Sequence, residues 1–281
     1  MFSFPADYEQ GWTLGSEINK TGIGLHTGIK SKVIIKPTEL PGFHFSFSDE
    51  ANKVFSLDIS QVRHTPLCTT IDLNEKKIST VEHLLASLIG VGLTHAHIEI
   101  TGNEIPLLDG SSIGWIEEIE KVGMVNSFTP PKPRPELNSP IFVNKGESVI
   151  FAIPSKILKL IGLIDFPHKA IGQQMFSIEL SPNKFVKEIA PARTFGFLDQ
   201  LEELKKAGLI KGGALENALV CNGDSWINPP LRFANEPVRH KLLDLIGDLA
   251  FVGLPRAQIF VYKGSHSLHN EFAASLQKVL T

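Results

Sequence analysis

Residues 238–247 read VRHKLLDLIG, and residues 81–90 read VEHLLASLIG. Both segments share Val-x-His, a leucine two residues after the histidine, and Leu-Ile-Gly five to seven residues after it. Each precedes a segment with the alternation of a strand, GLTHAHIEI at 92–100 and GLPRAQIFV at 253–261. The second copy has about one additional helical turn before its strand. Because a helix pattern and a strand pattern recur in the same order, we interpret the chain as an internal duplication.

A proline-rich segment separates the two copies. Residues 129–140 read TPPKPRPELNSP and hold five prolines, a residue that blocks helices and central strands. This composition predicts a linker at 129–138 between an N-terminal domain, residues 1–128, and a C-terminal domain, residues 139–281. We therefore expect an α+β fold of two similar sheet-plus-helix domains, with an active site at their interface.

Local patterns predict helices and strands in both halves. In the first half we expect strand-like structure at 21–37, a helix at 79–92 capped by Ser79 or Thr80, a strand at 94–100, a loop at 103–112 and a helix at 114–123. In the second half we expect strands at 140–145, 148–155, 159–167 and 257–264, and helices at 181–189, 197–208, 270–280 and for about four turns after Pro237. The pattern of residues 214–222 fits a helix or a strand.

Composition excludes several classes of protein. The 281 residues carry a formal net charge of −3, without the dense basic surface that nucleic-acid binding needs. The two cysteines, Cys68 and Cys221, cannot form a disulfide framework and lack the spacing of a thiolate metal site. No signal-peptide pattern and no apolar run of about 20 residues occurs. We expect a cytoplasmic protein without stable membrane insertion and, for lack of a coiled-coil pattern, a monomer.

His240, Asp244 and Asp248 follow one another at intervals of four residues, which places them on one stripe of a helix. Neighbouring carboxylates repel unless positive charge lies beside them. If the halves pack face to face, His83 joins His240 and Asp244 as a third zinc ligand, and a fourth position stays open for water. Asp248 would then orient another catalytic residue. Separate histidines and acids in ordinary hydrogen bonds explain these residues equally well at this point.

Three further side chains have candidate catalytic roles. Glu82 adjoins His83 and is either a general base for a metal-bound water or an exposed helix charge. His266 follows a predicted strand, where loops often carry function, and it is a candidate general acid, as is His269. Thr194, in the segment ARTFGF, could donate a hydrogen bond to an oxyanion, although a threonine taken at random seldom does.

Five segments together resemble one enzyme family. STVEHLLASL, NEIPLLDGSS, ARTFGF, VRHKLLDLIGDL and GSH occur in this order, and the likeness extends from GIGLHTG to the final helix. They resemble UDP-3-O-acyl-N-acetylglucosamine deacetylase, the zinc hydrolase of lipid A synthesis. The resemblance implies two similar α+β domains with the active site between them, in agreement with the duplication.

The resemblance also implies roles for individual residues. It implies Zn²⁺ as cofactor, with the ligands His83, His240 and Asp244. The implied catalytic groups are Glu82 as general base, His266 as general acid, Asp248 directed toward His266, and Thr194 at the oxyanion. For the substrate, UDP-3-O-acyl-N-acetylglucosamine, it implies contacts from Lys241, Lys263, Phe166, Phe195, Leu209 and Gly213. An insert at about 195–222 would form a hydrophobic passage for the acyl chain.

Two other functions compete with this interpretation. The first is a related zinc amidohydrolase that acts on another acylated amine or nucleotide sugar, which should not need a long acyl passage. The second is a non-catalytic binding protein that kept the fold. Loss of Glu82 or His266 would have favoured the second, and both residues are present.

Overall fold

A computed structural model describes residues 3–64 and 67–280. Across these residues the chain forms two five-stranded mixed sheets. The first has the order β2 (Ile18–Ile23), β3 (Lys30–Lys36), β9 (His95–Thr101), β4 (Gly42–Phe47), β5 (Phe55–Ser56). The second has the order β11 (Ile141–Lys145), β12 (Ser148–Pro154), β18 (Ala257–Tyr262), β13 (Lys159–Asp165), β14 (Gln173–Glu179). In each sheet the third and fourth strands are parallel and every other neighbouring pair is antiparallel. The two halves therefore share one strand topology.

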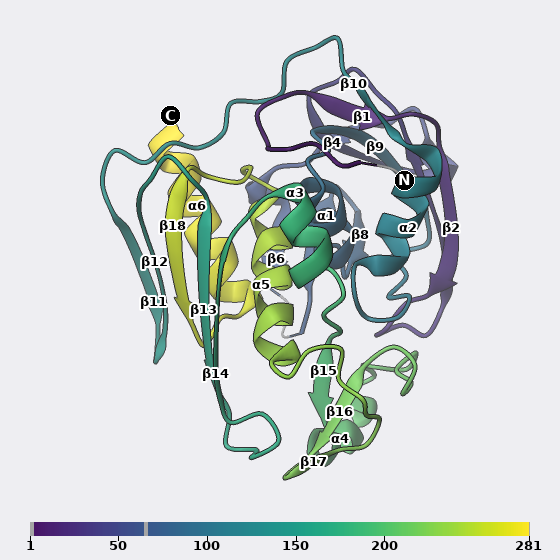
Figure 1. The fold of residues 1–281 in the computed structure, drawn as a ribbon. Helices are drawn as coiled ribbons and strands as arrows, with labels where there is room; N and C mark the ends of the chain where they lie inside the picture. Colours follow the sequence, from purple (N-terminus) through teal and green to yellow (C-terminus); the bar gives the residue numbers. More distant parts are fainter. Residues whose placement is uncertain (1–2, 65–66, 281) are drawn as a thin grey trace.

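The helices occupy equivalent places in the two halves. In the first half α1 (Glu82–Gly90) precedes β9 and α2 (Ile113–Val122) follows it, while in the second half α5 (Glu236–Leu249) precedes β18 and α6 (His266–Leu280) follows it. Helix α5 contacts β13 and β14, α6 contacts β11 and β12, and α1 contacts both α2 and α5. The helices thus lie between the two sheets, and α1 and α5 meet at the centre of the molecule (Figure 1).

Each half also carries a small three-stranded sheet, within the part of the chain that the structure describes. The first consists of β6 (Val62–His64), β7 (Thr69–Leu73) and β8 (Lys76–Ser79), directly before α1. The second consists of β15 (Phe195–Phe197), β16 (Leu219–Asn222) and β17 (Ser225–Trp226), with α4 (Leu201–Lys206) between its strands, and it precedes α5. The second small sheet projects at the bottom of the view in Figure 1. The remaining elements of the described residues are the β1–β10 pair (Trp12–Leu14 and Met124–Asn126), three short 3₁₀ turns (Ser48–Glu50, Ile59–Gln61 and Leu198–Gln200) and α3 (Pro182–Lys184), which continues as a π-helical turn over Phe185–Ile189.

A continuous hydrophobic core joins the halves through α1 and α5. Leu84 and Leu88 of α1 belong to the same buried cluster as Leu242 and Ile246 of α5. The two helix backbones approach closely at Gly247, where an added Cβ atom would lie 2.1 Å from the carbonyl oxygen of Glu82. A side chain cannot occupy that space, so glycine permits the contact.

Most of the predicted elements are confirmed, and the differences have local causes. The predicted cap of α1 is wrong. Val81 precedes the helix and makes no side-chain capping bond, whereas Thr80 has φ of 59° and donates its hydroxyl to Glu104. Helix α5 begins one residue before Pro237, because proline suits a first helical turn. Helix α6 begins at His266, earlier than expected, so that residue opens a helix and does not lie in a loop.

Three other expectations concern connections, ambiguous segments and thiols. The fully described segment 129–138 has no helix or named strand, apart from an isolated bridge between Glu136 and Arg256, and it crosses between the halves at the top of Figure 1. Residues 214–222 end in strand β16. Cys68 and Cys221 are buried and form no disulfide. Among the described residues, none of the helices has the length and apolarity that a membrane-spanning helix requires.

We expect Gly247→Ala to destabilise the protein. Alanine gains about 1 kcal/mol of helix propensity over glycine, but overpacking against a backbone carbonyl costs more, and we expect a net loss of about 2 kcal/mol in the free energy of unfolding. Gly196→Ala is the control, because nothing lies within 4 Å of an added Cβ there. Urea unfolding of both variants measures the difference, and equal stability of Gly247→Ala and wild type would contradict the close helix contact.

Candidate active site

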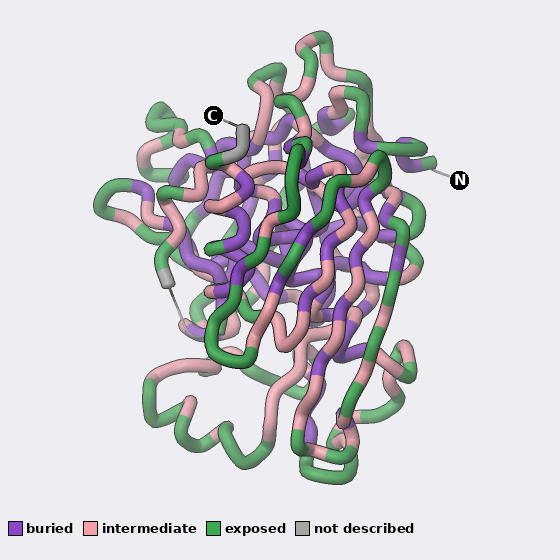
Figure 2. The backbone as a smooth tube through the Cα atoms, turned by 90° about the vertical axis from the view of Figure 1, so that its left-hand side faces the viewer, coloured by how far each residue is buried: buried purple, intermediate pink, exposed green. Residues whose placement is uncertain are grey.

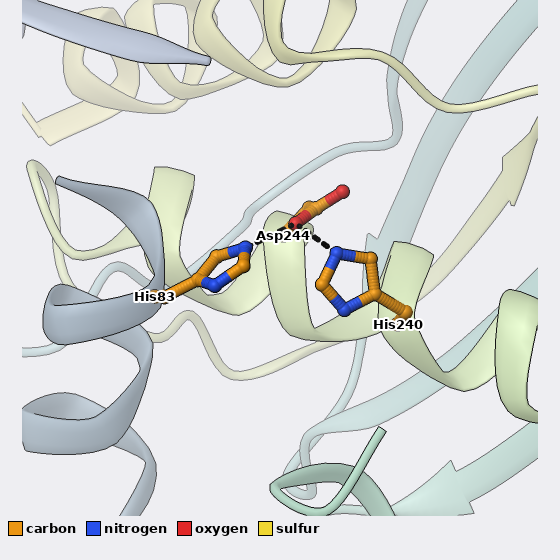
Figure 3. A group of neighbouring side chains, drawn as sticks. All are labelled: His83, His240 and Asp244. Atoms are coloured by element: carbon orange, nitrogen blue, oxygen red, sulfur yellow. Dashed lines mark ion pairs between the residues drawn. The ribbon is translucent and has the colours of Figure 1, made fainter. Parts of the chain in front are cut away.

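His83, His240 and Asp244 converge where α1 meets α5 (Figure 3). All three side chains are buried, and their candidate ligand atoms lie within 4.8 Å of one another. Oδ1 of Asp244 lies 3.3 Å from Nε2 of His240 and 3.6 Å from Nε2 of His83. Two ligand atoms on one tetrahedral ion, each about 2.0–2.1 Å from it, lie about 3.4 Å apart. The spacing of the three atoms therefore fits a single small metal ion.

The protonation of His240 supports a cation at this point. Nδ1 of His240 lies 3.0 Å from the carbonyl oxygen of Ala192, which accepts a hydrogen bond and cannot donate one. The proton is thus assigned to Nδ1, and the lone pair of Nε2 faces Asp244. Burial lowers the pKa of His240 to about 4, so the ring is neutral near pH 7. A neutral nitrogen and a carboxylate oxygen, both acceptors, face each other here, and a cation between them resolves the repulsion.

Asp244 uses its two oxygen atoms differently. Oδ2 accepts a hydrogen bond from Nζ of Lys241 at 3.0 Å. Oδ1 is buried and has no hydrogen-bond donor among the described residues. Burial opposes the charged form, but the cationic Lys241, with a smaller contribution from the surrounding imidazoles, outweighs it and holds the pKa of Asp244 well below its usual range. An ionised oxygen without a donor is the expected state of a monodentate metal ligand.

Glu82 lies beside this group at the start of α1. Its Oε2 accepts a hydrogen bond from the backbone N–H of Thr69 at 2.9 Å, and its Oε1 lies 3.8 Å from Nε2 of His266. The side chain is buried, which excludes the alternative of an exposed helix charge. Burial raises the pKa of Glu82 above its usual value although His266 and His83 act in the opposite direction. A carboxylate with a raised pKa in a buried pocket is suited to accept a proton.

His266 lines the same pocket as Glu82, and Asp248 holds it in place from behind the pocket wall. Nδ1 of His266 lies 2.8 Å from Oδ2 of Asp248, and Nδ1 of His269 lies 2.9 Å from the same oxygen. Thr69 donates its hydroxyl to Oδ1 of Asp248 at 2.5 Å. Burial disfavours a charged imidazole, but the carboxylates of Asp248 and Glu82 outweigh it and raise the pKa of His266 to about 9. His266 is therefore cationic at neutral pH and can donate a proton from Nε2.

A second set of potential metal ligands consists of Asp248, His266 and His269. Its atoms already satisfy one another, since Asp248 accepts a hydrogen bond from each of the two imidazoles. The set of His83, His240 and Asp244 lacks such internal hydrogen bonds and leaves an acceptor unpaired. Because of this contrast, His83, His240 and Asp244 are the better candidates for metal ligands.

A cavity of about 160 Å³ opens onto these groups. Its polar wall includes Glu82, His83, His240, Asp244, His266, Thr194 and Lys241, and its apolar wall includes Leu25, Leu67, Leu107 and Phe195. The backbone of Thr194 is fixed, because its N–H donates to the carbonyl oxygen of Gly110 at 2.7 Å and its own carbonyl accepts from Leu219 at 2.8 Å. Strand β15 therefore begins at a rigid point beside the pocket.

Four of the six predicted substrate residues do not line this cavity, namely Phe166, Lys263, Leu209 and Gly213. Phe166 packs its ring against Phe195 at 5.6 Å between centroids, so it supports a residue that does line it. Lys263 pairs with Glu147 at 2.8 Å, and this contact raises its pKa. At Gly213, an added Cβ would lie 3.7 Å from the side chain of Leu25, which faces the cavity. Phe166 and Gly213 thus lie next to residues of the cavity wall, and Lys263 directly precedes Gly264, which lines the cavity.

Sequence reasoning missed two groups that shape the site. Thr69 of β7 holds Glu82 with its N–H and Asp248 with its hydroxyl, yet its sequence context is that of any strand threonine. The Ala192 carbonyl sets the tautomer of His240, and a backbone group leaves no trace in a residue pattern. The contact of Thr69 with Asp248 joins residues 179 positions apart, and that of Ala192 with His240 joins residues 48 positions apart.

Comparisons with known proteins agree with this geometry. The family model described as LpxC, UDP-3-O-acyl N-acetylglycosamine deacetylase, matches residues 12–278. The UDP-3-O-acyl-N-acetylglucosamine deacetylase of Trichormus variabilis is 46% identical over 268 residues, which cover 93% of this chain and 96% of that protein. The protein of the same name from Synechocystis sp. is 41% identical over 275 residues, which cover 95% and 98%.

A plant relative extends the comparison. The Arabidopsis thaliana protein named probable UDP-3-O-acyl-N-acetylglucosamine deacetylase 1, mitochondrial, is 38% identical over 285 residues, which cover 94% of this chain and 87% of the relative. The family match and these relatives each span nearly the whole chain. The chain therefore belongs to the UDP-3-O-acyl-N-acetylglucosamine deacetylase family.

Proposed function

We propose that this chain is a zinc-dependent deacetylase that hydrolyses the N-acetyl group of UDP-3-O-acyl-N-acetylglucosamine in lipid A biosynthesis. The products are acetate and a free glucosamine amine. One observation carries the proposal: a metal-binding set, a buried carboxylate and a cationic imidazole face the same cavity. The names of the relatives supply the substrate, and a UDP-sugar supports a cytoplasmic location.

The ligands favour zinc over other metals. Two imidazole nitrogens and one carboxylate oxygen are a common set of three protein ligands for a catalytic zinc, here His83, His240 and Asp244. A hard ion such as Mg²⁺ prefers oxygen ligands and octahedral geometry. When bound, zinc supplies Lewis acidity toward the amide carbonyl and lowers the pKa of a water molecule.

The residues of the chain move the protons. Glu82 accepts a proton from the attacking water while the oxygen of that water forms a bond to the carbonyl carbon of the acetyl group. The hydroxyl of Thr194 donates to the oxyanion of the tetrahedral intermediate. His266 gives its proton to the nitrogen as the C–N bond breaks, and Asp248 keeps the imidazole oriented and charged beforehand. The 3.8 Å between Glu82 and His266 allows both to reach one reacting amide.

The substrate's other parts would lie along the remaining walls of the cavity. Lys241 lines the cavity and lies 5.7 Å from the centroid of the Phe195 ring, so it can pair with an anionic part of the substrate. The insert at about 195–222 supplies Phe195 at the cavity and is our candidate for the acyl passage, with Leu209 and Gly213 further along it. Lys263 and Phe166 are candidate contacts for the nucleotide at the outer rim.

The shared strand order of the two sheets supports an internal duplication. We place the domains at residues 1–128 and 139–281, joined by the linker at 129–138. His83 then comes from one domain, and His240 and Asp244 from the other, which makes the active site an interface site.

A related zinc amidohydrolase with another acylated amine or nucleotide sugar as substrate is the alternative. Acetate release from the 3-O-acylated UDP-sugar, compared with UDP-N-acetylglucosamine without the acyl chain, separates the two functions. The proposed function requires a strong preference for the acylated compound.

Glu82→Gln and His266→Gln should each lower kcat by about 10²- to 10⁴-fold, the usual contribution of a general base or acid. Both should retain the metal, because neither residue belongs to the ligand set. Acetate release and zinc content would be measured on the same samples. Near-wild-type turnover of either variant with zinc bound would show that the assigned role is wrong.

Purified protein should contain about one zinc ion per chain, and His240→Ala should lose most of it, since two ligands hold zinc far more weakly than three. Asp248→Asn is the matched control. It removes a charge from the same helix face but should keep the zinc and lose turnover. Elemental analysis by mass spectrometry gives the metal content, and a His240→Ala variant that retains stoichiometric zinc would exclude this centre.

The rate should also depend on the protonation of His266. Since the proton donor is active in its cationic form and its pKa is about 9, kcat/KM should fall as the pH rises through about 9. Asp248→Asn removes the carboxylate that stabilises the cation while burial remains, so the alkaline limb should move to lower pH. A pH profile of the residual activity tests this shift, and an unmoved limb would assign it to another group.

A further inference from the structure

Asp248, the carboxylate that holds His266, lies behind the cavity wall and receives hydrogen bonds from two further residues, Thr69 and His269. Buried positions fill the interior of the molecule (Figure 2), and Asp248, Thr69 and His269 are among them, each with an exposed fraction of 0%. None of the three lines the cavity. A carboxylate buried this deeply has no bulk water to pair with, so protein donors must satisfy it.

The Thr69 hydroxyl fixes the plane of the Asp248 carboxylate. The χ2 torsion of aspartate is soft, so the plane is fixed only when both oxygen atoms have partners. Two imidazoles contact Oδ2, whereas Oδ1 receives the Thr69 hydroxyl at 2.5 Å and no other hydrogen bond from the described residues. Without this hydroxyl, Oδ1 would be a buried charged atom without a donor, and the carboxylate would turn toward another one.

The backbone of Thr69 is itself held in place. Its N–H donates to Oε2 of Glu82 at 2.9 Å, and its carbonyl oxygen accepts from the N–H of Val81 at 3.3 Å. Threonine is stiff at χ1, so a fixed backbone directs the hydroxyl at Asp248. One residue of β7 thus contacts Glu82, the proposed base, and also the carboxylate that holds the proposed acid.

His269 supplies a second imidazole to Asp248. Its Nδ1 lies 2.9 Å from Oδ2, the oxygen that Nδ1 of His266 also contacts at 2.8 Å. Because an ionised carboxylate can only accept, both imidazoles donate from Nδ1. Burial lowers the pKa of His269, so this ring is neutral near pH 7. His269 therefore adds a donor to the carboxylate without placing a second positive charge beside His266.

We propose that Thr69 and His269 are positioning residues that fix Asp248 and thereby direct the Nε2 proton of His266 into the cavity, a role that rests on the proposed function, in which His266 is the general acid. Thr69 belongs to the first half of the chain and His269 to α6 at its end. The geometry of the acid therefore depends on the same meeting of the two halves that brings the metal-ligand candidates together.

Thr69→Val replaces the hydroxyl with a methyl group and keeps the backbone N–H that holds Glu82. We expect kcat for acetate release to fall by about 10- to 100-fold, the usual cost of losing a contact that orients a functional group. KM should stay unchanged, because Thr69 does not line the cavity. Thr69→Ser restores the hydroxyl and should recover most of the rate.

Thr70→Val is the matched control for Thr69→Val. It removes a buried hydroxyl from the next residue of the same strand, which donates to Ser79 at 3.0 Å. Urea unfolding should show a similar loss of stability in both valine variants, since each loses one buried hydrogen bond. Only Thr69→Val should lose turnover.

His269 is tested by a second pair of variants. His269→Leu removes the donor, whereas His269→Asn keeps one, because the side-chain amide nitrogen of asparagine can take the place of Nδ1. We expect the leucine variant to lower kcat by about tenfold or more at unchanged KM, and the asparagine variant to retain most of the rate.

The effect of Thr69 should also require His266. In a His266→Gln background, Thr69→Val should cause no further loss of the residual rate, because the acid that the hydroxyl positions is absent. A loss through Glu82 would instead persist in this background. The double variant therefore separates action on the acid from action on the base.

Proton NMR of protein with isotopically labelled histidine tests the contacts without turnover. The Nδ1 protons of His266 and His269 should resonate downfield of the amide region, as imidazoles that donate to a buried carboxylate do. Thr69→Val should shift the His266 signal, and Thr70→Val should leave it in place. If the wild-type protein released no acetate, the proposed function would fail, and the NMR signals alone would decide whether Thr69 positions His266.

Three results would overturn the positioning role. The first is wild-type kcat in Thr69→Val, or an equal loss in Thr70→Val, which would indicate general destabilisation. The second is an undiminished further loss from Thr69→Val in the His266→Gln background. The third is a His266 proton signal that Thr69→Val leaves unchanged.

Discussion

The contact between α1 and α5 determines where every proposed catalytic group lies. Gly247 has no side chain, so the backbone of α5 can touch the carbonyl of Glu82. That contact brings His83 of one half within 3.6 Å of Asp244 in the other half. The apolar sides of both helices belong to one core, so packing energy holds the polar group together. The site depends on the hydrophobic core for its geometry and on the proposed metal for its charge balance.

The arrangement explains why one helix face carries two buried carboxylates. Asp244 and Asp248 are one turn apart, but each is directed at a different partner. Asp244 faces Lys241 and the two imidazole nitrogens, whereas Asp248 accepts hydrogen bonds from His266, His269 and Thr69. Buried charges persist when they are paired and hydrogen-bonded. The repulsion expected within α5 is therefore offset by Lys241 of the same helix and by the donors that β7 and α6 supply to Asp248.

The sequence predicts those parts of the site that have a repeated or periodic pattern. His83 could be aligned with His240 because Val-x-His and Leu-Ile-Gly recur, and Asp244 follows from helical spacing. Thr69 could not be found, because its hydroxyl contact with Asp248 joins a strand and a helix 179 residues apart. The cap expected at Thr80 failed for a related reason: the buried carboxylate of Glu104 takes the hydroxyl that would have capped α1. Long-range polar contacts leave no local pattern.

The two matching helices also show how equivalent positions take different roles. Position 87 corresponds to 244 in the repeated pattern, and Ser87 donates its hydroxyl to the carbonyl of His83 within α1. An aspartate at 87 would add a further carboxylate beside the three proposed metal ligands and would close the position that a catalytic zinc keeps open for water. Glu82 corresponds to Arg239, which instead pairs with Glu188 and stacks on Phe176. In the proposed mechanism, one half thus supplies the base and a single metal ligand, and the other half supplies two ligands. With these proposed roles, the asymmetry between two similar scaffolds would create a single catalytic site.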